Sequence, residues 1–159
     1  LESDSTDYVI RSLPLEQIVK PAVRKYAPMF ISKKLSLEMS SLTATVLTDE
    51  KWAQFIIEQI LSNSLKYTRT GSIRIWQKDP AALVIEDTGI GIDPADIPRL
   101  GERGFTGYNG RLDKKSTGIG LYLCKEISRR LSHTLTIESE PCKGTRVTID
   151  FATRQLQAE

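Results

Sequence analysis

The sequence predicts an α/β protein: a two-layer α/β sandwich in which a mixed β-sheet is covered on one face by about three helices. Three observations support this fold class. Segments with the apolar spacing of helices are interspersed with short alternating segments typical of strands. Several neighbouring strands are separated by tight turns, which leave no room for crossover helices. The length of 159 residues suits one domain, so residues 1–159 are expected to form a single unit.

In the first half of the chain, two helices alternate with short strands. Residues 14–34 space their apolar side chains at helical intervals, although two prolines weaken the prediction of one unbroken helix. The helix of residues 49–67 begins at Asp49, a favourable N-cap, and carries an apolar stripe. The strands are expected at residues 7–12, 35–39 and 43–47, of which the last two form a hairpin.

The second half holds four strands, one helix and a long loop. A helix is expected over residues 119–131, where apolar side chains share one face. Most of the chain's ten glycines lie between Gly89 and Gly120, which predicts a long loop of the kind that is usually functional. The strands are expected at residues 72–77, 82–87, 134–138 and 145–151.

Composition excludes several classes of function. Lys and Arg number 22 and Asp and Glu 20, a formal charge of +2, so binding of a nucleic-acid backbone is not expected. The longest apolar run has five residues, against the roughly 18–20 that cross a bilayer. A single histidine and two cysteines 18 positions apart disfavour a structural zinc site and a disulfide scaffold. Because the chain opens at Leu1 and not at Met, we expect it to be a piece of a longer protein.

Three polar residues occupy positions where apolar ones are expected. Asn63 lies roughly 20° from Ile56 around its helix and therefore inside the apolar stripe. Strand alternation places Asp87 and Thr145 on the faces of their strands that carry apolar side chains. A satisfied internal hydrogen-bond network could explain any one of them. All three together, beside a glycine-rich loop, favour a bound polar ligand, because a buried carboxylate without a partner is costly.

The glycines indicate what kind of ligand this is. Gly89 and Gly91 follow Asp87 directly, and Gly118 and Gly120 open the next helix. Glycines let backbone N–H groups approach an anion closely, and a helix N-terminus adds a favourable dipole. A phosphate-bearing ligand is therefore expected, although a lone G-x-G turn is a weak signal.

Four motifs in a fixed order resemble the ATP-binding catalytic domain of bacterial sensor histidine kinases, within the Bergerat-fold group that also contains gyrase, heat-shock-ninety and MutL ATPases. The motifs are EQILSNSLKYT at 58–68, EDTGIGI at 86–92, STGIGLYL at 116–123 and Lys143-Gly144-Thr145. The likeness covers nearly the whole chain. The lid between the two glycine motifs is similar to the lids of Gram-positive cell-envelope-stress and peptide-antibiotic sensor kinases.

This resemblance implies a set of roles in binding ATP and Mg²⁺. Asp87 would accept a hydrogen bond from the adenine amino group, with Thr145 supporting that contact. Asn63 would supply an oxygen to Mg²⁺, and Lys66 would meet phosphate, which makes these two the expected catalytic residues. The other expected nucleotide contacts are Tyr67, Gly89, Gly91, Ile92, Arg103, Phe105, Gly118, Ile119, Gly120 and Leu121.

One departure from the family pattern bears on activity. Many of these kinases carry a second Asn four residues before the Mg²⁺-binding one, where this chain has Gln59, which could reach the metal through water. The ATPases of the group carry a Glu there that activates water, so Gln59 favours a kinase over a hydrolase. Glu58 lies about 100° further round the helix and is expected to face away from the site.

The resemblance also implies partners. The only histidine, His133, is expected to be an ordinary turn residue, so the phosphoacceptor histidine would lie upstream, in a dimerising domain of the same protein. A response regulator would then receive the phosphoryl group, and the full protein would be a homodimer. This domain would be cytoplasmic in an integral membrane protein, with no contact to membrane or nucleic acid. An anti-sigma-type serine kinase of the same fold and a nucleotide-binding module without phosphotransfer are the alternatives.

Overall fold

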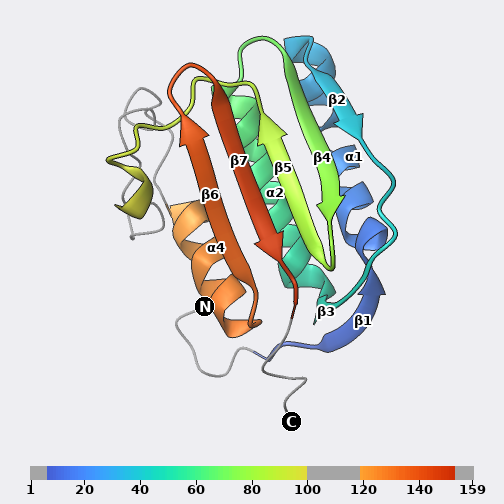
Figure 1. Ribbon diagram of the computed structural model, residues 1–159. Coiled ribbons are helices and arrows are strands. Elements are labelled where there is room, and N and C mark those ends of the chain that lie inside the picture. Colours follow the sequence, from blue (N-terminus) through green and yellow to red (C-terminus); the bar gives the residue numbers. More distant parts are fainter. Residues whose placement is uncertain (1–6, 100–118, 153–159) are drawn as a thin grey trace.

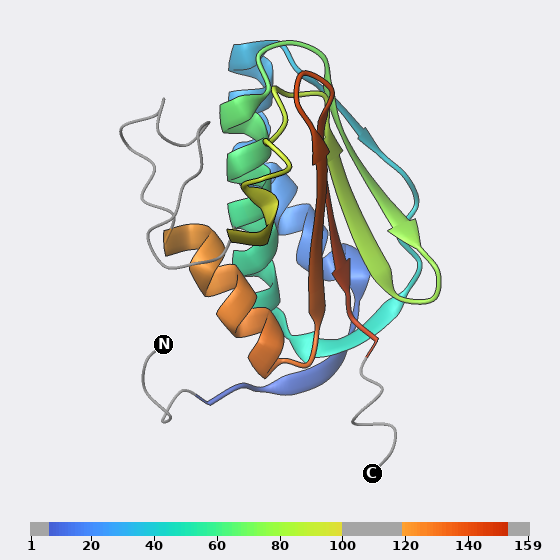
Figure 2. The same ribbon diagram turned by 60° about the vertical axis from the view of Figure 1, so that its left-hand side comes forward.

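The computed structural model describes residues 7–99 and 119–152 of the protein, which form two layers (Figure 1). One layer is a five-stranded sheet, and the other consists of the helices α1, α2 and α4, which cover one of its faces (Figure 2). The elements are β1 (Ile10–Pro14), α1 (Leu15–Lys33), β2 (Ser36–Met39), β3 (Thr45–Asp49), α2 (Glu50–Tyr67), β4 (Ser72–Lys78), β5 (Ala82–Asp87), the short 3-10 helix η1 (Ile97–Arg99), α4 (Ile119–Arg130), β6 (Thr134–Glu140) and β7 (Gly144–Asp150).

The sheet is mixed, as the sequence predicts. Its strand order is β2-β4-β5-β7-β6, with β2 parallel to β4 and the other neighbours antiparallel. β4–β5 and β6–β7 are the two hairpins expected from their tight turns. β7 pairs with β5 on one side and with β6 on the other. Its register places Thr145 between Asp87 of β5 and Ser139 of β6.

The predicted hairpin of residues 35–39 and 43–47 is wrong. β2 instead pairs with β4, while β3 pairs with β1 in a separate two-stranded sheet. The connection between β2 and β3 is held by Gln77, whose side-chain oxygen accepts from the backbone N–H groups of Thr43 and Ala44 at 2.9 and 2.8 Å. Each strand gains a partner that is distant in sequence, and β3 thereby buries Val46 against the core. The first strand also begins at Ile10, later than expected.

Tertiary packing explains why α1 is unbroken although Pro21 and Pro28 lie inside it. Each proline removes one backbone hydrogen bond, but α1 buries a continuous apolar face against the core. α2 begins as predicted, because Asp49 Oδ1 accepts from the N–H of Trp52 at 2.9 Å. The other oxygen of Asp49 accepts from Val9 N–H at 2.7 Å and thus fastens the start of the chain to this helix.

The core lies between the sheet and the helices. Its largest fully buried side chains are Leu15, Ile18, Ile56, Ile57, Leu61, Leu65, Ile73, Ile75, Leu83, Ile85, Ile127 and Ile149. Among the described residues, no helix covers the opposite face of the sheet (Figure 2), which carries charged side chains together with Trp76 and Val84. On it, Glu86 accepts from Arg74 at 3.3 Å and from Arg146 at 2.7 Å, so the central strands are joined by paired charges.

Candidate functional site

The end of β5 places a carboxylate in the layer between the sheet and the helices. Asp87 is 8 % exposed and follows Leu83 and Ile85 on the same face, which confirms its predicted direction. Its Oδ1 accepts from the N–H of Gly89 at 2.9 Å and of Thr145 at 3.2 Å. Two backbone donors on one oxygen fix the orientation of the carboxylate.

Burial raises the pKa of Asp87, and hydrogen bonds to Gly89, Ser64 and Thr145 oppose that rise. The nearby charge of Glu86 adds a smaller upward push on this pKa. A buried carboxyl group whose ionisation is made less favourable by its surroundings is typical of functional sites. Ser64 was not predicted as a site residue. Its neighbour Asn63 carries the sequence signal, and only the packing of α2 on β5 shows that the Ser64 side chain meets Asp87.

A small hydrogen-bond network surrounds Thr145. Its hydroxyl lies 2.9 Å from Ser139 Oγ, which donates to the carbonyl of Gly144 at 2.8 Å and accepts from Ile92 N–H at 2.8 Å. Ser139 therefore joins β6, β7 and the segment that follows β5. Sequence reasoning missed Ser139. Alternation places it on the helix-facing side of β6, but its partners depend on the register with β7.

Two glycines of the first motif stand where a side chain would collide with backbone. A Cβ at Gly89 would lie 2.5 Å from the carbonyl oxygen of Tyr67. Gly91 has φ +76°, and a Cβ there would lie 2.0 Å from the carbonyl oxygen of Glu140. The segment is also fastened by hydrogen bonds from Ile90 N–H to Tyr67 and from Cys142 N–H to Ile90. It is thus clamped between the end of α2 and the β6–β7 turn.

The C-terminal half of α2 carries the remaining polar candidates. Asn63 is half-buried, Lys66 is exposed, and Lys66 Nζ lies 5.9 Å from the centre of the Tyr67 ring. The carboxylate of Glu58 pairs with Lys25 of α1 at 3.0 Å, so this side chain faces α1. Gln59 faces α4 instead, since a Cβ at Gly120 would lie 2.4 Å from its side-chain oxygen. The first turn of α4 therefore approaches the helix that carries Asn63.

Some predicted residues are brought together and others are not described. The structure joins Asp87, Gly89 and Thr145 by direct hydrogen bonds, and Ile92 through Ser139. Ile119, Gly120 and Leu121 form the start of α4. Arg103, Phe105 and Gly118 lie outside the described residues.

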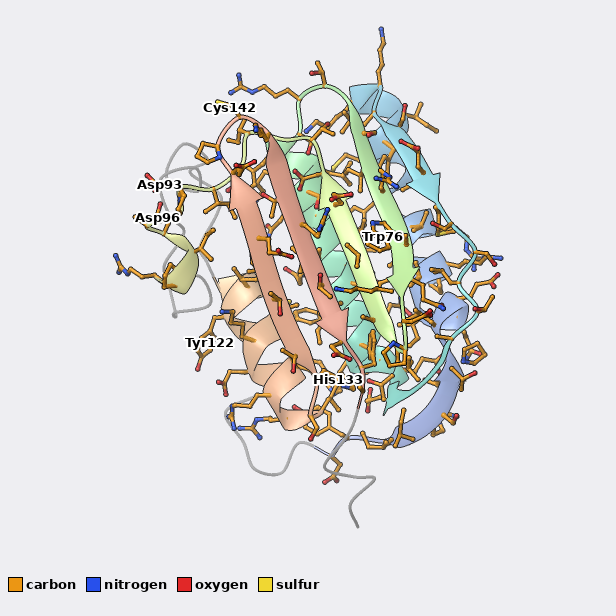
Figure 3. The ribbon with its side chains drawn as sticks, in the orientation of Figure 1. Trp76, Asp93, Asp96, Tyr122, His133 and Cys142 are labelled. Carbon is orange, nitrogen blue, oxygen red and sulfur yellow. The ribbon has the colours of Figure 1, made fainter. Side chains whose placement is uncertain are left out.

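The only histidine lies at the other end of β6 from the β6–β7 turn, which Cys142 marks (Figure 3). His133 occupies a turn, as predicted, but it is only 6 % exposed. Its Nε2 lies 2.8 Å from Thr48 Oγ1, and its ring packs edge-on to Phe151 with the centroids 4.7 Å apart. Burial lowers the pKa of His133 to about 4, although the charge of Asp150 opposes this. This is a buried structural histidine, remote from Asp87.

Two further observations concern the binding of metal ions and the crossing of membranes. Among the described residues, no three His, Cys, Asp or Glu side chains gather closely enough to hold a metal ion. No helix in the described part of the chain has both the length and the apolar character needed to cross a bilayer.

The architecture is that of the catalytic domain of histidine kinases. The solved catalytic domain of histidine kinase ThkA superimposes with a TM-score of 0.77 over 91 % of this chain and 96 % of that one, at 14 % identity. The two proteins thus share a mixed sheet backed by three helices. At this low sequence identity the similarity shows the fold alone.

The sequence then defines the family. The family described as "Histidine kinase-, DNA gyrase B-, and HSP90-like ATPase" matches residues 48–155, and the chain belongs to it. The chain is 35 % identical over 154 residues to the sensor histidine kinase YxdK of Bacillus subtilis, covering 93 % of this chain and 47 % of that protein. It is 34 % identical over 151 residues to the sensor protein BceS of the same organism, covering 93 % and 45 %.

These relatives confirm the predicted resemblance to Gram-positive sensor kinases. The chain spans about half the length of the curated relatives it matches.

Proposed function

We propose that residues 1–159 form a single ATP-binding domain that binds ATP with Mg²⁺ and presents its γ-phosphoryl group to a histidine on an upstream domain of the same protein. The observation that carries this proposal is the buried, oriented carboxylate of Asp87. With two backbone donors on Oδ1, the carboxylate has lone pairs to offer to an exocyclic amino group. Adenine presents such a donor at the position where guanine presents a carbonyl.

The residues around Asp87 fit a nucleotide. Gly89 and Gly91 let the backbone after β5 lie close to the end of α2 and to the β6–β7 turn, and a side chain at Gly89 would come within 2.9 Å of Asp87 Oδ1. The start of α4 offers backbone N–H groups and the positive end of a helix dipole to phosphates. Lys66, exposed at the end of α2, would add a positive charge, and Tyr67 would pack beside the base or ribose.

Asn63 would hold Mg²⁺ together with the phosphates. Mg²⁺ prefers oxygen ligands, keeps several waters and is commonly held by a few protein oxygens plus substrate phosphates. An amide oxygen on α2, with no cluster of acidic side chains among the described residues, suits this mode of binding. When bound, the cation would neutralise charge on the transferred phosphoryl group.

Two observations support phosphotransfer over hydrolysis. The position that carries a glutamate in the ATPases of this fold is Gln59, which has no basic carboxylate. The neighbouring carboxylate of Glu58 is engaged by Lys25 on α1. Neither side chain can serve as the base that activates water, so the chain is suited to position ATP for attack by another group.

His133 is unsuited to be the acceptor. Its ring is buried between Thr48 and Phe151, at the end of β6 away from Asp87. The acceptor would therefore be supplied by the upstream domain of a homodimeric, membrane-anchored sensor, with this domain in the cytoplasm. A response regulator would receive the phosphoryl group from that histidine.

Two measurements test the proposal. Calorimetric titration of the chain with ATP, with and without Mg²⁺, should show binding that Mg²⁺ strengthens. Incubation with γ-labelled ATP should leave the isolated chain unlabelled, while addition of the upstream domain should give acid-labile label on that domain. Absence of ATP binding would reject the assignment, and label on His133 would reject the proposed acceptor. Label on a serine of a separate protein would favour the serine-kinase alternative.

A further inference from the structure

We infer that Ser139 is a positioning residue for base selection: by fixing the direction of the Thr145 hydroxyl, it makes this end of the pocket reject guanine. The inference rests on the proposed binding of ATP and adds a residue that lies outside the four sequence motifs. It concerns the orientation of a single proton, which follows from counting donors and acceptors around Ser139.

Ser139 Oγ has three polar neighbours but only one proton. Ile92 N–H is a donor, so at 2.8 Å it must donate to Ser139 Oγ. The carbonyl of Gly144, also at 2.8 Å, can only accept, so the proton of Ser139 points to it. The third neighbour, Thr145 Oγ1 at 2.9 Å, must then donate its own proton to Ser139.

This count determines what Thr145 offers to a ligand. With its proton directed at Ser139, the hydroxyl of Thr145 presents only lone pairs elsewhere. Asp87, whose Oδ1 receives the backbone N–H of the same Thr145, is also an acceptor. On the paired residues Asp87 and Thr145, β5 and β7 therefore each contribute a side-chain acceptor. This pair favours a base or a bound water that donates, such as the amino group of adenine, and repels the carbonyl of guanine.

Removal of the Ser139 hydroxyl would release this arrangement. The Thr145 hydroxyl could then rotate about its C–O bond and donate to an incoming carbonyl. A pocket with one acceptor and one adjustable hydroxyl should discriminate less between adenine and guanine. Ser139 also holds Ile92 and the β6–β7 hairpin, so a purely structural role for it has to be distinguished.

The experiment compares Kd for ATP and GTP in the wild-type chain and in Ser139→Ala. We expect the preference for ATP over GTP to fall at least fivefold, with ATP binding weakened and GTP binding unchanged or strengthened. A structural role alone would weaken both nucleotides by the same factor and leave the ratio unchanged, which would overturn the inference. The matched control is Thr136→Ala, an exposed position of β6 that faces the uncovered side of the sheet and should leave both constants unchanged.

A second variant shows whether Ser139 acts through Thr145. Thr145→Val keeps the shape of the side chain and removes the hydroxyl. In that background Ser139→Ala should have no further effect on the ATP-to-GTP ratio, since no hydroxyl remains to be oriented. An equal effect in both backgrounds would contradict the mechanism.

Folding of the variants and the underlying proposal are checked separately. If Ser139→Ala does not fold, Ser139→Cys replaces the hydroxyl by a weakly bonding thiol of similar shape, and the same ratio is measured on it. Failure of the wild-type chain to bind ATP would reject the proposed function itself. Normal ATP binding by the wild type, with an unchanged ratio in the Ser139 variant, would reject only the inference about Ser139.

Discussion

Asp87→Asn is expected to separate nucleotide binding from folding. The amide keeps a side-chain oxygen that can accept from Gly89 and Thr145, as Oδ1 does in the wild type. The other oxygen becomes an NH₂ group, which would face the donating amino group of adenine. The substitution therefore replaces an acceptor by a donor at one position and leaves the shape of the side chain almost unchanged.

The expected loss of binding is large. A hydrogen bond to a charged group contributes about 1.5–3 kcal/mol, and leaving a buried donor unpaired costs about 1–3 kcal/mol. Together these effects amount to about 2.5–6 kcal/mol, so Kd for ATP should rise by roughly 10²- to 10⁴-fold. Titration calorimetry or competition with a fluorescent nucleotide measures this change directly.

The free energy of unfolding should not fall. Because burial raises the pKa of Asp87, ionisation of this carboxyl is more costly in the folded than in the unfolded state. Its contribution to stability is fully present below its ordinary pKa of 3.8 and is lost as pH rises through the higher pKa of the folded protein. A neutral amide avoids that cost, so urea unfolding near neutral pH should show equal or greater stability for Asp87→Asn.

Asp87→Ala is the matched control, because it removes the acceptor for both backbone N–H groups and should lose stability as well as binding. Binding of ATP by Asp87→Asn within threefold of the wild type would refute the reasoning. So would a marked loss of stability in that variant.

Three further predictions concern stability and metal dependence. Burial lowers the pKa of His133 to about 4, so below its ordinary pKa of 6.5 the unfolded chain takes up a proton more readily than the folded one, and the free energy of unfolding should fall by about 2 kcal/mol between about pH 7 and about pH 5. Urea unfolding of His133→Gln should show a weaker dependence of stability on pH. An unchanged dependence would contradict this. Gly91→Ala should lower stability by about 2 kcal/mol or more in thermal melts, because its Cβ meets backbone at a positive φ, whereas Gly120→Ala, which meets only the flexible end of Gln59, should melt near the wild type. Asn63→Ala should remove most of the strengthening of ATP binding by Mg²⁺ without changing affinity in EDTA, and equal losses in both conditions would argue against a metal-binding role.

Local signals account for the elements that sequence reasoning predicted well. Asp49 caps α2 because its side chain reaches the Trp52 N–H three residues on, which is a contact within one turn. The β4–β5 and β6–β7 hairpins follow from tight turns between alternating segments. The pairing of β2 with β4 and of β3 with β1 could not be predicted, because it joins segments far apart in the chain and the alternation of each strand fits several partners.

The sequence by itself determined which chemistry this protein carries. Residue types in a fixed order identified the family, and strand periodicity placed Asp87 on the apolar face of β5, because side-chain direction along a strand depends only on local geometry. Only the tertiary structure decided which side chains lie around that carboxylate. Ser64 meets Asp87, and Ser139 meets Thr145, through helix packing and strand register, which are settled by the burial of many side chains at once. The burial of His133 against Thr48 has the same origin.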